Sequence, residues 1–233
     1  ERAGARIALN AARREGSPDS LTEARRYLEA VVGDDAPPER SESFLEHGSA
    51  TVEMLSRTTP MKFMWAKDYS DYHPEEPGGS VVGRTCECRP FNSSVLGDYR
   101  TRLRPGVLEV KIPMPTTGAD YRWMNLRTRV PRKGLPTIAK RLLQGVGGLL
   151  LGRRYAAGGQ ALAAGMFAGV LEAGIPVWTN TTLLRLDADG DRVTGAVLDH
   201  DGREITVVAR RGVVLATGGF DHSMDMRWKF QSE

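Results

Sequence analysis

The chain has 233 residues, of which 40% are hydrophobic and 26% are charged, and its formal net charge is +3. This length can bury a sizeable core, and the composition is typical of an ordinary soluble globular protein. No apolar run is long enough to cross a bilayer, so no integral membrane segment is expected. The small net charge does not by itself indicate a nucleic-acid-binding protein.

Cysteine and histidine placement argues against several kinds of site. Cys86 and Cys88 are too close for an ordinary disulfide and lack a second pair of ligands for zinc. The first ten residues contain no apolar stretch of the kind found in signal peptides. The four histidines also lack metal-ligand spacing: His47, His73, His200 and His222. We therefore expect a reduced, cytoplasmic protein without a metal site.

Arginine is concentrated in three stretches, which are residues 100–104, residues 122–132, and Arg153 with Arg154. Each cluster can be a solvated face, or it can meet an anionic cofactor or a membrane surface. The sequence Tyr-Arg-Trp at residues 121–123 could stack a base, but no wider basic and aromatic platform surrounds it. Nucleic acid is therefore not an expected partner.

The first elements in chain order are helices. Ser20 is an N-cap residue and Glu23 follows three positions later, which predicts a helix over residues 21–32 that Gly33 ends. A second helix is expected over residues 41–57, after two prolines. A third is expected over residues 135–150.

Residues 60–79 combine aromatic side chains with a Pro- and Gly-rich exit and show no sustained period. This pattern predicts a loop that carries large side chains, and such loops often line sites. Phe63 and Trp65 can equally fill the core beneath the loop. Tyr72 differs because polar residues flank it, so its hydroxyl is expected to face a polar space.

The second half of the chain predicts alternating helix and strand. After short extended pieces, including a strand at residues 108–112, residues 153–172 predict a helix followed by a strand at residues 175–178. Three short strands are expected next, at residues 181–186, 192–198 and 204–209, with Asp-Gly turns between them. The residues expected to be buried on the helix are Leu162, Met166, Phe167, Val170 and Leu171.

Residues 213–217 are aliphatic or β-branched and predict a short buried strand that runs directly into Gly218 and Gly219. Without side-chain bulk, the backbone N–H groups there could approach a phosphate or a flavin closely. An ordinary glycine turn after a parallel strand remains the alternative. No G-x-G-x-x-G motif occurs between a strand and a helix, so the first βαβ unit of a dinucleotide fold is expected to be missing and the chain to be an internal piece of a longer protein.

The motif order GGQAL, IPVW, T-x-L-x-x-L and GVVLATGGF resembles the flavoproteins of the fumarate reductase and succinate dehydrogenase superfamily. Within it, four stretches look like 3-ketosteroid Δ1-dehydrogenases: PGGSVVGRTCECRPF, LRPGVLEVKIPMPTTGADYRWMN, RRYAAGGQALAAG and ATGGFDHSMDMRWKFQ. The resemblance runs from about Leu21 to the end. It implies an α/β fold: a partial, Rossmann-like FAD-binding domain with a three-stranded β-meander and the start of a substrate cap.

The resemblance also implies a reaction and its residues. Such enzymes bind FAD and remove two hydrogens from carbons 1 and 2 of a 3-oxosteroid. A tyrosine base takes the proton and flavin N5 takes the hydride, while polarisation of the ketone acidifies carbon 2. Tyr72 matches the tyrosine that supports the base by a hydrogen bond, and Tyr69 matches a position that lines the steroid pocket. The positions matching cofactor contacts are Thr217, Gly218 and Gly219 at the flavin and Leu183 at the adenine.

The expected organisation is an atypical segment at residues 1–20, a partial FAD-binding domain at 21–220 with a substrate side at 60–135, and the start of a cap at 221–233. The base and the ketone-polarising group belong to family segments beyond Glu233, so we expect little dehydrogenation by this chain alone. The expected partners are a steroid or other enone and an electron acceptor. Two alternatives stay open, namely a fumarate-reductase-like or other enone-directed flavoprotein, and a non-catalytic remnant.

Overall fold

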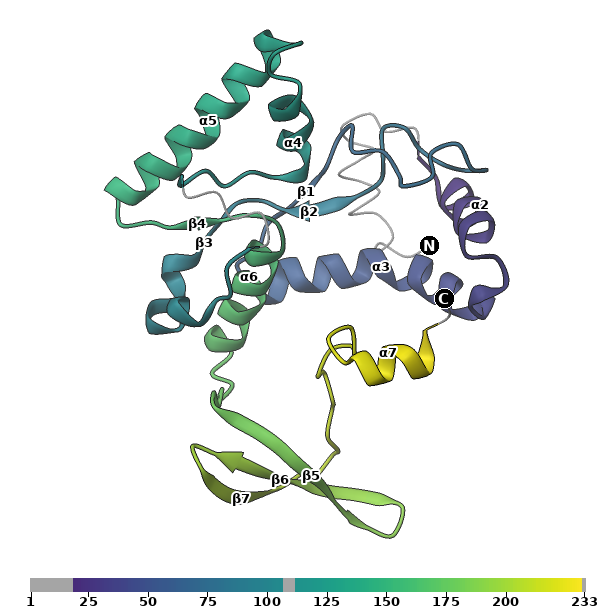
Figure 1. Cartoon of the computed structure of the whole chain (residues 1–233), viewed down its shortest axis with the longest axis vertical. Coiled ribbons are helices and arrows are strands. Elements are labelled where there is room, and N and C mark those ends of the chain that lie inside the picture. The colour runs from purple at the N-terminus through teal and green to yellow at the C-terminus, as the bar shows by residue number, and fades with distance from the viewer. Residues whose placement is uncertain (1–18, 107–111, 232–233) are drawn as a thin grey trace. The chain divides into compact units, whose positions relative to one another are not determined.

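The computed structural model describes residues 19–106 and 112–231, which form two compact units, residues 1–175 and 176–233. Most of the strand expected at residues 108–112 lies outside the described residues, as does nearly all of the segment expected to be atypical at residues 1–20. Figure 1 shows helices and short strands mixed in the first unit and a twisted three-stranded sheet in the second. Within the described residues, no helix is long and apolar enough to cross a membrane.

The first unit begins with two helices whose ends follow from local sequence. Helix α2, Leu21–Val32, starts where the Ser20 side chain accepts a hydrogen bond from the backbone N–H of Glu23, at 3.1 Å. It ends at Gly33, whose φ of +51° is a conformation that glycine adopts at little cost. A short 3₁₀ helix, η2 (Gly33–Asp35), leads into α3, Pro38–Thr58, which begins three residues before the expected start. The first helix is confirmed at both ends.

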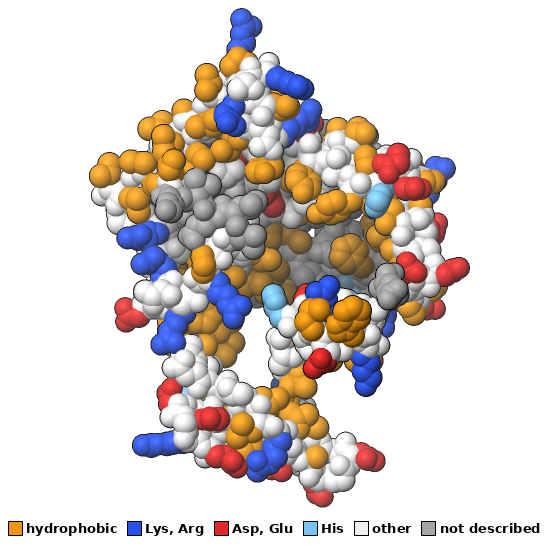
Figure 2. All heavy atoms as spheres, viewed as in Figure 1, with side chains coloured by type: hydrophobic (Ala, Val, Ile, Leu, Met, Phe, Trp, Pro, Cys, Tyr) orange, Lys and Arg blue, Asp and Glu red, His pale blue; other side chains and the backbone are white. Residues whose placement is uncertain are grey.

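Four short strands form two antiparallel pairs in this unit. Strand β1 (Phe63–Trp65) pairs with β2 (Cys86–Cys88), with Trp65 opposite Cys86. Strand β3 (Phe91–Asn92) pairs with β4 (Tyr155–Ala156), and a 3₁₀ segment, η3 (Ser93–Arg102), follows β3. The remaining helices are α4 (Gly118–Asn125), α5 (Pro131–Leu150) and α6 (Gly158–Glu172). Hydrophobic side chains stay at the surface along α5 (Figure 2).

The core forms around the small residues of α6 and not around its large ones. Ala161 and Ala164 are fully buried, whereas Leu162 and Met166 are 40% and 44% exposed. The prediction that Leu162 and Met166 are buried is therefore wrong, although Phe167, Val170 and Leu171 are partly buried. The reason is close approach: a Cβ at Gly165 would lie 2.1 Å from Cγ of Met61, the largest fully buried side chain of this core. Only a small-residue face lets these elements meet at that distance.

The second unit is the expected meander. Strands β5 (Thr181–Asp189), β6 (Arg192–His200) and β7 (Arg203–Val208) pair antiparallel in the order 5-6-7. Gly190 and Gly202 adopt positive φ angles of 57° and 81° in the two connecting turns, as the Asp-Gly pairs predict. Helix α7, Met224–Phe230, follows after a stretch without regular structure.

Two expected strands are absent from the described structure. Residues 213–217 pair with no strand, and Val214 and Leu215 are 92% and 55% exposed. Residues 175–178 are likewise irregular, and every described strand pair is antiparallel. A buried parallel strand exists only between neighbouring strands, and the described part of this chain supplies none beside residues 213–217. The prediction of a mixed α/β fold holds, while these two strand predictions fail.

Candidate functional site

A loop at residues 66–85, called here the tyrosine loop, connects β1 to β2 and carries Tyr69 and Tyr72. Its two arms are held together by backbone hydrogen bonds that continue the hairpin. The N–H groups of Ala66, Asp68 and Asp71 donate to the carbonyls of Thr85, Val82 and Ser80, at 2.9 to 3.0 Å. The loop is therefore irregular in conformation but closed along most of its length.

Two glycines allow this loop to lie close to its surroundings. Gly83 has a φ of +70°, and a Cβ there would fall 1.6 Å from the carbonyl oxygen of Tyr69. Gly78 has a φ of +78°, and a Cβ there would fall 2.3 Å from the carbonyl oxygen of Glu23 in α2. Both positions require glycine for the conformation and for the space. Tyr69 is thus placed by direct backbone contact with the opposite arm.

Arg84 ties the loop to α2 and to the start of the described chain. Its Nε and Nη2 donate to the carboxylate of Asp19 at 3.0 Å, and Nη2 also donates to the carbonyl of Gly78. Its Nη1 lies 2.9 Å from Oδ2 of Asp71 as an ion pair, without the alignment of a hydrogen bond. The guanidinium also stacks over the ring of Tyr27, at 5.3 Å from the centroid. The side chain of Arg84 is only 20% exposed, so these charges interact with little screening by water.

The side chains of the two tyrosines of the loop interact with each other. A hydrogen bond with Tyr72 raises the pKa of Tyr69 above its ordinary value, and the nearby Tyr72, partial burial and Glu87 raise it further. Tyr69 is 38% exposed and Tyr72 is 86% exposed, so both side chains reach the surface of the unit. The expectation that Tyr72 faces a polar space agrees with this exposure. Tyr69 keeps its proton at neutral pH and can act as a hydrogen-bond donor.

Trp65 and Phe63 behave differently from these tyrosines. Trp65 is buried, and its indole N–H donates to the carbonyl of Gly83 at 3.1 Å. Phe63 is partly buried and packs against the core around Met61. Both rings fill the core beneath the loop, which was one of the two interpretations of the sequence.

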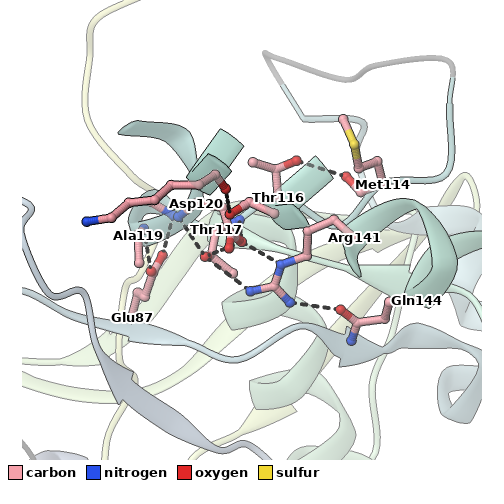
Figure 3. A network of polar contacts seen from close by, with 11 residues as sticks. Glu87, Met114, Thr116, Thr117, Ala119, Asp120, Arg141 and Gln144 are labelled. Carbon is pink, nitrogen blue, oxygen red and sulfur yellow. Dashed lines mark hydrogen bonds and ion pairs between the residues drawn. The ribbon is translucent and has the colours of Figure 1, made fainter. Parts of the chain in front are cut away.

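Glu87, at the centre of β2, joins this strand to helix α4 (Figure 3). Its two carboxylate oxygens accept hydrogen bonds from the backbone N–H groups of Gly118 and Ala119, at 2.7 and 3.0 Å. A carboxylate at this position satisfies the free N–H groups of the first turn and complements the helix dipole. Glu87 therefore fixes the start of α4 and also contributes to the environment of Tyr69.

A buried ion pair between Asp120 and Arg141 also stabilises the start of α4. Thr117 and Asp120 form a reciprocal capping box, and Nε of Arg141 in α5 donates to Oδ2 of Asp120 at 2.5 Å. Asp120 and Arg141 are only 8% and 6% exposed. Arg141 also donates to Oε1 of Gln144, at 2.8 Å. Figure 3 shows these side chains converging on the first turn of α4.

The second unit contains an open groove of about 430 Å³. Leu183 of β5 lines it, and so does Thr217, the last of the irregular residues 213–217. The floor is apolar, formed by the face of the meander that carries Ala196 and Leu198. Two residues matched separately to cofactor contacts, 34 positions apart in sequence, therefore share one groove.

The glycines after Thr217 leave the backbone open. Gly218 has a φ of +83°, and nothing lies within 4 Å of a Cβ built there; at Gly219 the nearest atoms are the carboxylate oxygens of Asp221, at 3.9 and 4.0 Å. A planar ring could approach these peptide groups at van der Waals distance, and the apolar groove could receive another ring. These features fit part of a flavin dinucleotide. Within the described residues, no group of three or more His, Cys, Asp or Glu side chains could hold a metal ion.

Comparison with known protein families shows the family to which the chain belongs. A family described as an FAD binding domain matches residues 2–232. The chain belongs to this FAD binding domain family. The match begins near the first residue, whereas the motifs placed the start of the resemblance at about Leu21.

Individual proteins and one solved structure show which members of the family the chain resembles. The chain is 35% identical to a 3-oxosteroid 1-dehydrogenase of Mycolicibacterium smegmatis over 94% of its length, and 30% identical to one of Comamonas testosteroni over 91%. It is similar to a crystal structure of 3-ketosteroid Δ1-dehydrogenase from Sterolibacterium denitrificans in complex with 1,4-androstadiene-3,17-dione, with a TM-score of 0.78 and 28% identity over 91% of the chain. The chain spans 39%, 38% and 39% of these three proteins. It is thus an FAD-binding chain related to 3-oxosteroid 1-dehydrogenases.

Reasoning from the sequence alone did not identify Arg84 or Glu87 as important. Arg84 reaches Asp19, which lies 65 residues earlier, and Glu87 caps a helix that starts 31 residues later. One signal was available for the capped helix, because Thr117 and Asp120 have capping-box spacing. The placement of Tyr69 and Tyr72 in one loop was predicted, but their mutual hydrogen bond was not.

Proposed function

We propose that this chain is part of an FAD-dependent enzyme that dehydrogenates a 3-oxosteroid between carbons 1 and 2. The observation that carries the proposal is the pair of accessible, hydrogen-bonded tyrosines on a loop held by Arg84 and Gly83. Binding and catalytic residues are often carried by loops that a rigid scaffold holds in place. The relatives named as 3-oxosteroid 1-dehydrogenases support the choice of substrate class.

In this proposal Tyr72 supports a second tyrosine that removes the proton from carbon 2. A phenol that donates a hydrogen bond to another phenol stabilises the phenolate of its partner and lowers the partner's pKa. Such a partner would take a proton more readily at neutral pH. Tyr69 lines the steroid pocket in this assignment, and its hydrogen bond with Tyr72 orients both rings.

The cofactor would be held by Thr217, Gly218 and Gly219 at the flavin and by Leu183 at the adenine. Thr217 offers a hydroxyl for a ring heteroatom, while the glycines offer peptide groups that no side chain covers. When bound, FAD supplies the two-electron acceptor for the hydride that leaves carbon 1. The reoxidising electron acceptor is a further partner in this proposal.

A second candidate substrate class is a smaller cyclic ketone or enone. The chain is 28% identical over 91% of its length to a 4-oxocyclohex-2-ene-1-carboxylate 5-dehydrogenase of Sinomonas cyclohexanicum, and it spans 36% of that protein. Dehydrogenation next to a ring ketone would be common to both classes. We further propose that the chain alone dehydrogenates little, because the resemblance assigns the base and the ketone-polarising group to other segments.

The test is Tyr72→Phe in the full-length, FAD-loaded protein. If Tyr72 supports the base, kcat with a 3-oxosteroid should fall about tenfold or more, since one hydrogen bond to a charged group is lost, while FAD affinity stays unchanged. Tyr121→Phe is the matched control, because Tyr121 is a half-exposed tyrosine of α4 outside the loop. Equal losses of turnover and FAD affinity would contradict the assigned role. Turnover of 4-oxocyclohexene carboxylates in preference to steroids would favour the second substrate class.

A further inference from the structure

Helix α5 buries glycines and an arginine and exposes its large apolar side chains, the reverse of an ordinary surface helix. The residues that it buries are Gly134, Arg141, Gly145 and Gly148. The aliphatic residues that it leaves exposed are Leu135, Leu142, Leu143, Val146, Leu149 and Leu150, with Leu143 and Leu150 at 73% and 84% exposure. A surface helix normally buries its apolar stripe and exposes its charges. An exposed apolar stripe of this size indicates a surface that meets a partner.

The buried face of α5 is fixed, so the helix cannot simply rotate to hide its leucines. A Cβ at Gly145 would lie 1.5 Å from the carbonyl oxygen of Pro113, and one at Gly148 would lie 2.8 Å from the ring of Tyr155. Arg141 is anchored to Asp120 on the same face. These contacts commit the opposite side of the helix to the outside of the unit.

The exposed apolar residues form one stripe. With 100° of rotation per residue, the six aliphatic side chains span an arc of about 120°, centred about 130° from the buried glycines. Arg132 falls within this arc near one edge, and Lys140 and Lys133 lie about 60° and 80° beyond that edge. Leu151 and Gly152 end the helix, and the exposed Arg153 and Arg154 come directly after.

The charge around this stripe has one sign. Between residues 121 and 154 the sequence contains no Asp or Glu, although the whole chain carries a net charge of only +3. Figure 2 shows the hydrophobic side chains along α5 with Lys and Arg beside them at the helix end. The cations of this stretch are Arg122, Arg127, Arg129, Arg132, Lys133, Lys140, Arg141, Arg153 and Arg154. Two of them are paired with acidic residues from outside the stretch, Arg141 with Asp120 and Arg122 with Asp68.

We propose that α5 docks this protein on the surface of an anionic lipid bilayer. An amphipathic helix with leucines on one side and Lys or Arg beside them lies in the interface plane, with its apolar stripe among the acyl chains and its cations among the headgroups. Helix α5 has both features and is not of the kind that crosses a membrane. The exposed cations lie at both ends of the helix, with Arg132 and Lys133 in its first turn and Arg153 and Arg154 after its last, which suits a surface of uniform negative charge.

Membrane docking would place the protein where a lipophilic substrate dissolves. That advantage rests on the proposed steroid function, but the docking itself does not. The test therefore measures binding and not turnover, so that failure of one proposal can be told apart from failure of the other.

The experiment is vesicle flotation of the full-length, FAD-loaded protein. The vesicles contain phosphatidylcholine alone, or phosphatidylcholine and phosphatidylglycerol at a ratio of about 3:1. Binding is expected to the anionic vesicles and should weaken as salt rises. Neutralising three cations together, Arg132→Gln, Lys133→Gln and Lys140→Gln, should weaken binding about 100-fold, or roughly fivefold per charge. Leu143→Ser with Leu150→Ser should weaken it at least about tenfold.

Matched controls come from helix α3. Arg40→Gln with Arg57→Gln removes exposed cations, and Phe44→Ser with Met54→Ser removes exposed apolar side chains, so neither pair should change vesicle binding. Absence of binding to anionic vesicles at low salt would overturn the proposal. Equal effects of the α3 and α5 variants would overturn it too. Light scattering supplies a further check: a dimer that Leu143→Ser with Leu150→Ser converts to a monomer would assign the stripe to a second copy of the chain instead.

Discussion

The tyrosine loop in the first unit and the segment at residues 209–219 in the second unit present their candidate residues in opposite ways. The loop has almost no regular secondary structure, yet buried ion pairs, backbone hydrogen bonds and close glycine contacts hold it on several sides. The segment has the composition of a buried strand, yet it has no regular secondary structure and Val214 is 92% exposed. A sequence pattern typical of regular secondary structure therefore does not show how firmly a segment is held by its contacts.

The contrast has a physical origin. The loop finds its partners within its own unit, since Asp71 and Gly78 lie within the loop and Asp19 and α2 lie beside it. The segment contributes one side of a groove and needs something to cover its exposed side, which could be further strands, the cofactor or both. The loop should thus be sensitive to mutation in the chain as it stands, and the segment far less so.

The largest expected effect is a difference in the free energy of unfolding between alanine substitutions at two glycines with similar φ angles. Gly83→Ala should destabilise the protein by about 4 kcal/mol, because the new Cβ collides with the Tyr69 carbonyl and the φ is positive. Gly218→Ala has the same φ penalty but open space, so it should cost only about 1 kcal/mol. Urea denaturation measures both. Equal destabilisation by the two variants would show that the loop is no better fixed than the segment.

Removing the charge at the centre of the loop should have the next largest effect. Arg84→Gln leaves the carboxylates of Asp19 and Asp71, which are only 8% and 6% exposed, without their guanidinium. We expect a loss of about 3 kcal/mol in the free energy of unfolding. Arg25→Gln is the control, because its ion pair with Glu42 is about half exposed and should contribute no measurable stability. A neutral result for Arg84→Gln would mean that the glycines alone hold the loop.

The thiol at the base of the loop gives the third and smallest test. Burial, with smaller contributions from Cys88 and Glu87, raises the pKa of Cys86 from 9.0 to about 11. At pH 8 its thiolate fraction, and hence its alkylation by iodoacetamide, should be about 100-fold lower than in the unfolded chain. Because the folded pKa is the higher one, the associated stability is fully present below pH 9 and is lost as the pH rises through about 11. Alkylation at the unfolded rate would indicate that the base of the loop opens readily.

The sequence predicted best those elements whose signals are local. Ser20 and Gly33 delimit α2 by side-chain capping and by a positive φ, which depend on neighbouring residues only. The Asp-Gly turns of the meander work in the same way, since the turn geometry requires glycine. Tyr69, Tyr72, Leu183 and Thr217 were named from motifs, and the structure brings each pair together within one unit.

The features that the sequence did not predict depend on contacts with residues far away in the chain. Whether Leu162 or Ala161 of α6 is buried depends on Met61, about one hundred residues earlier, which approaches too closely for a large side chain. Arg84 is an ordinary arginine in the sequence until Asp19 and Asp71 are seen beside it. The apolar stripe of α5 shows the same limit, because the periodicity identifies the stripe but not the side of the helix that is buried.

The fluorescence of Trp65 can report whether the tyrosine loop is open or closed. Its indole ring is buried, and the N–H is bonded to the carbonyl of Gly83, within the arm that touches Tyr69. Opening of the loop would break that bond and admit water to the ring, which changes the wavelength at which indole emits. The emission of Trp65 would therefore report whether the loop that carries the two tyrosines is closed.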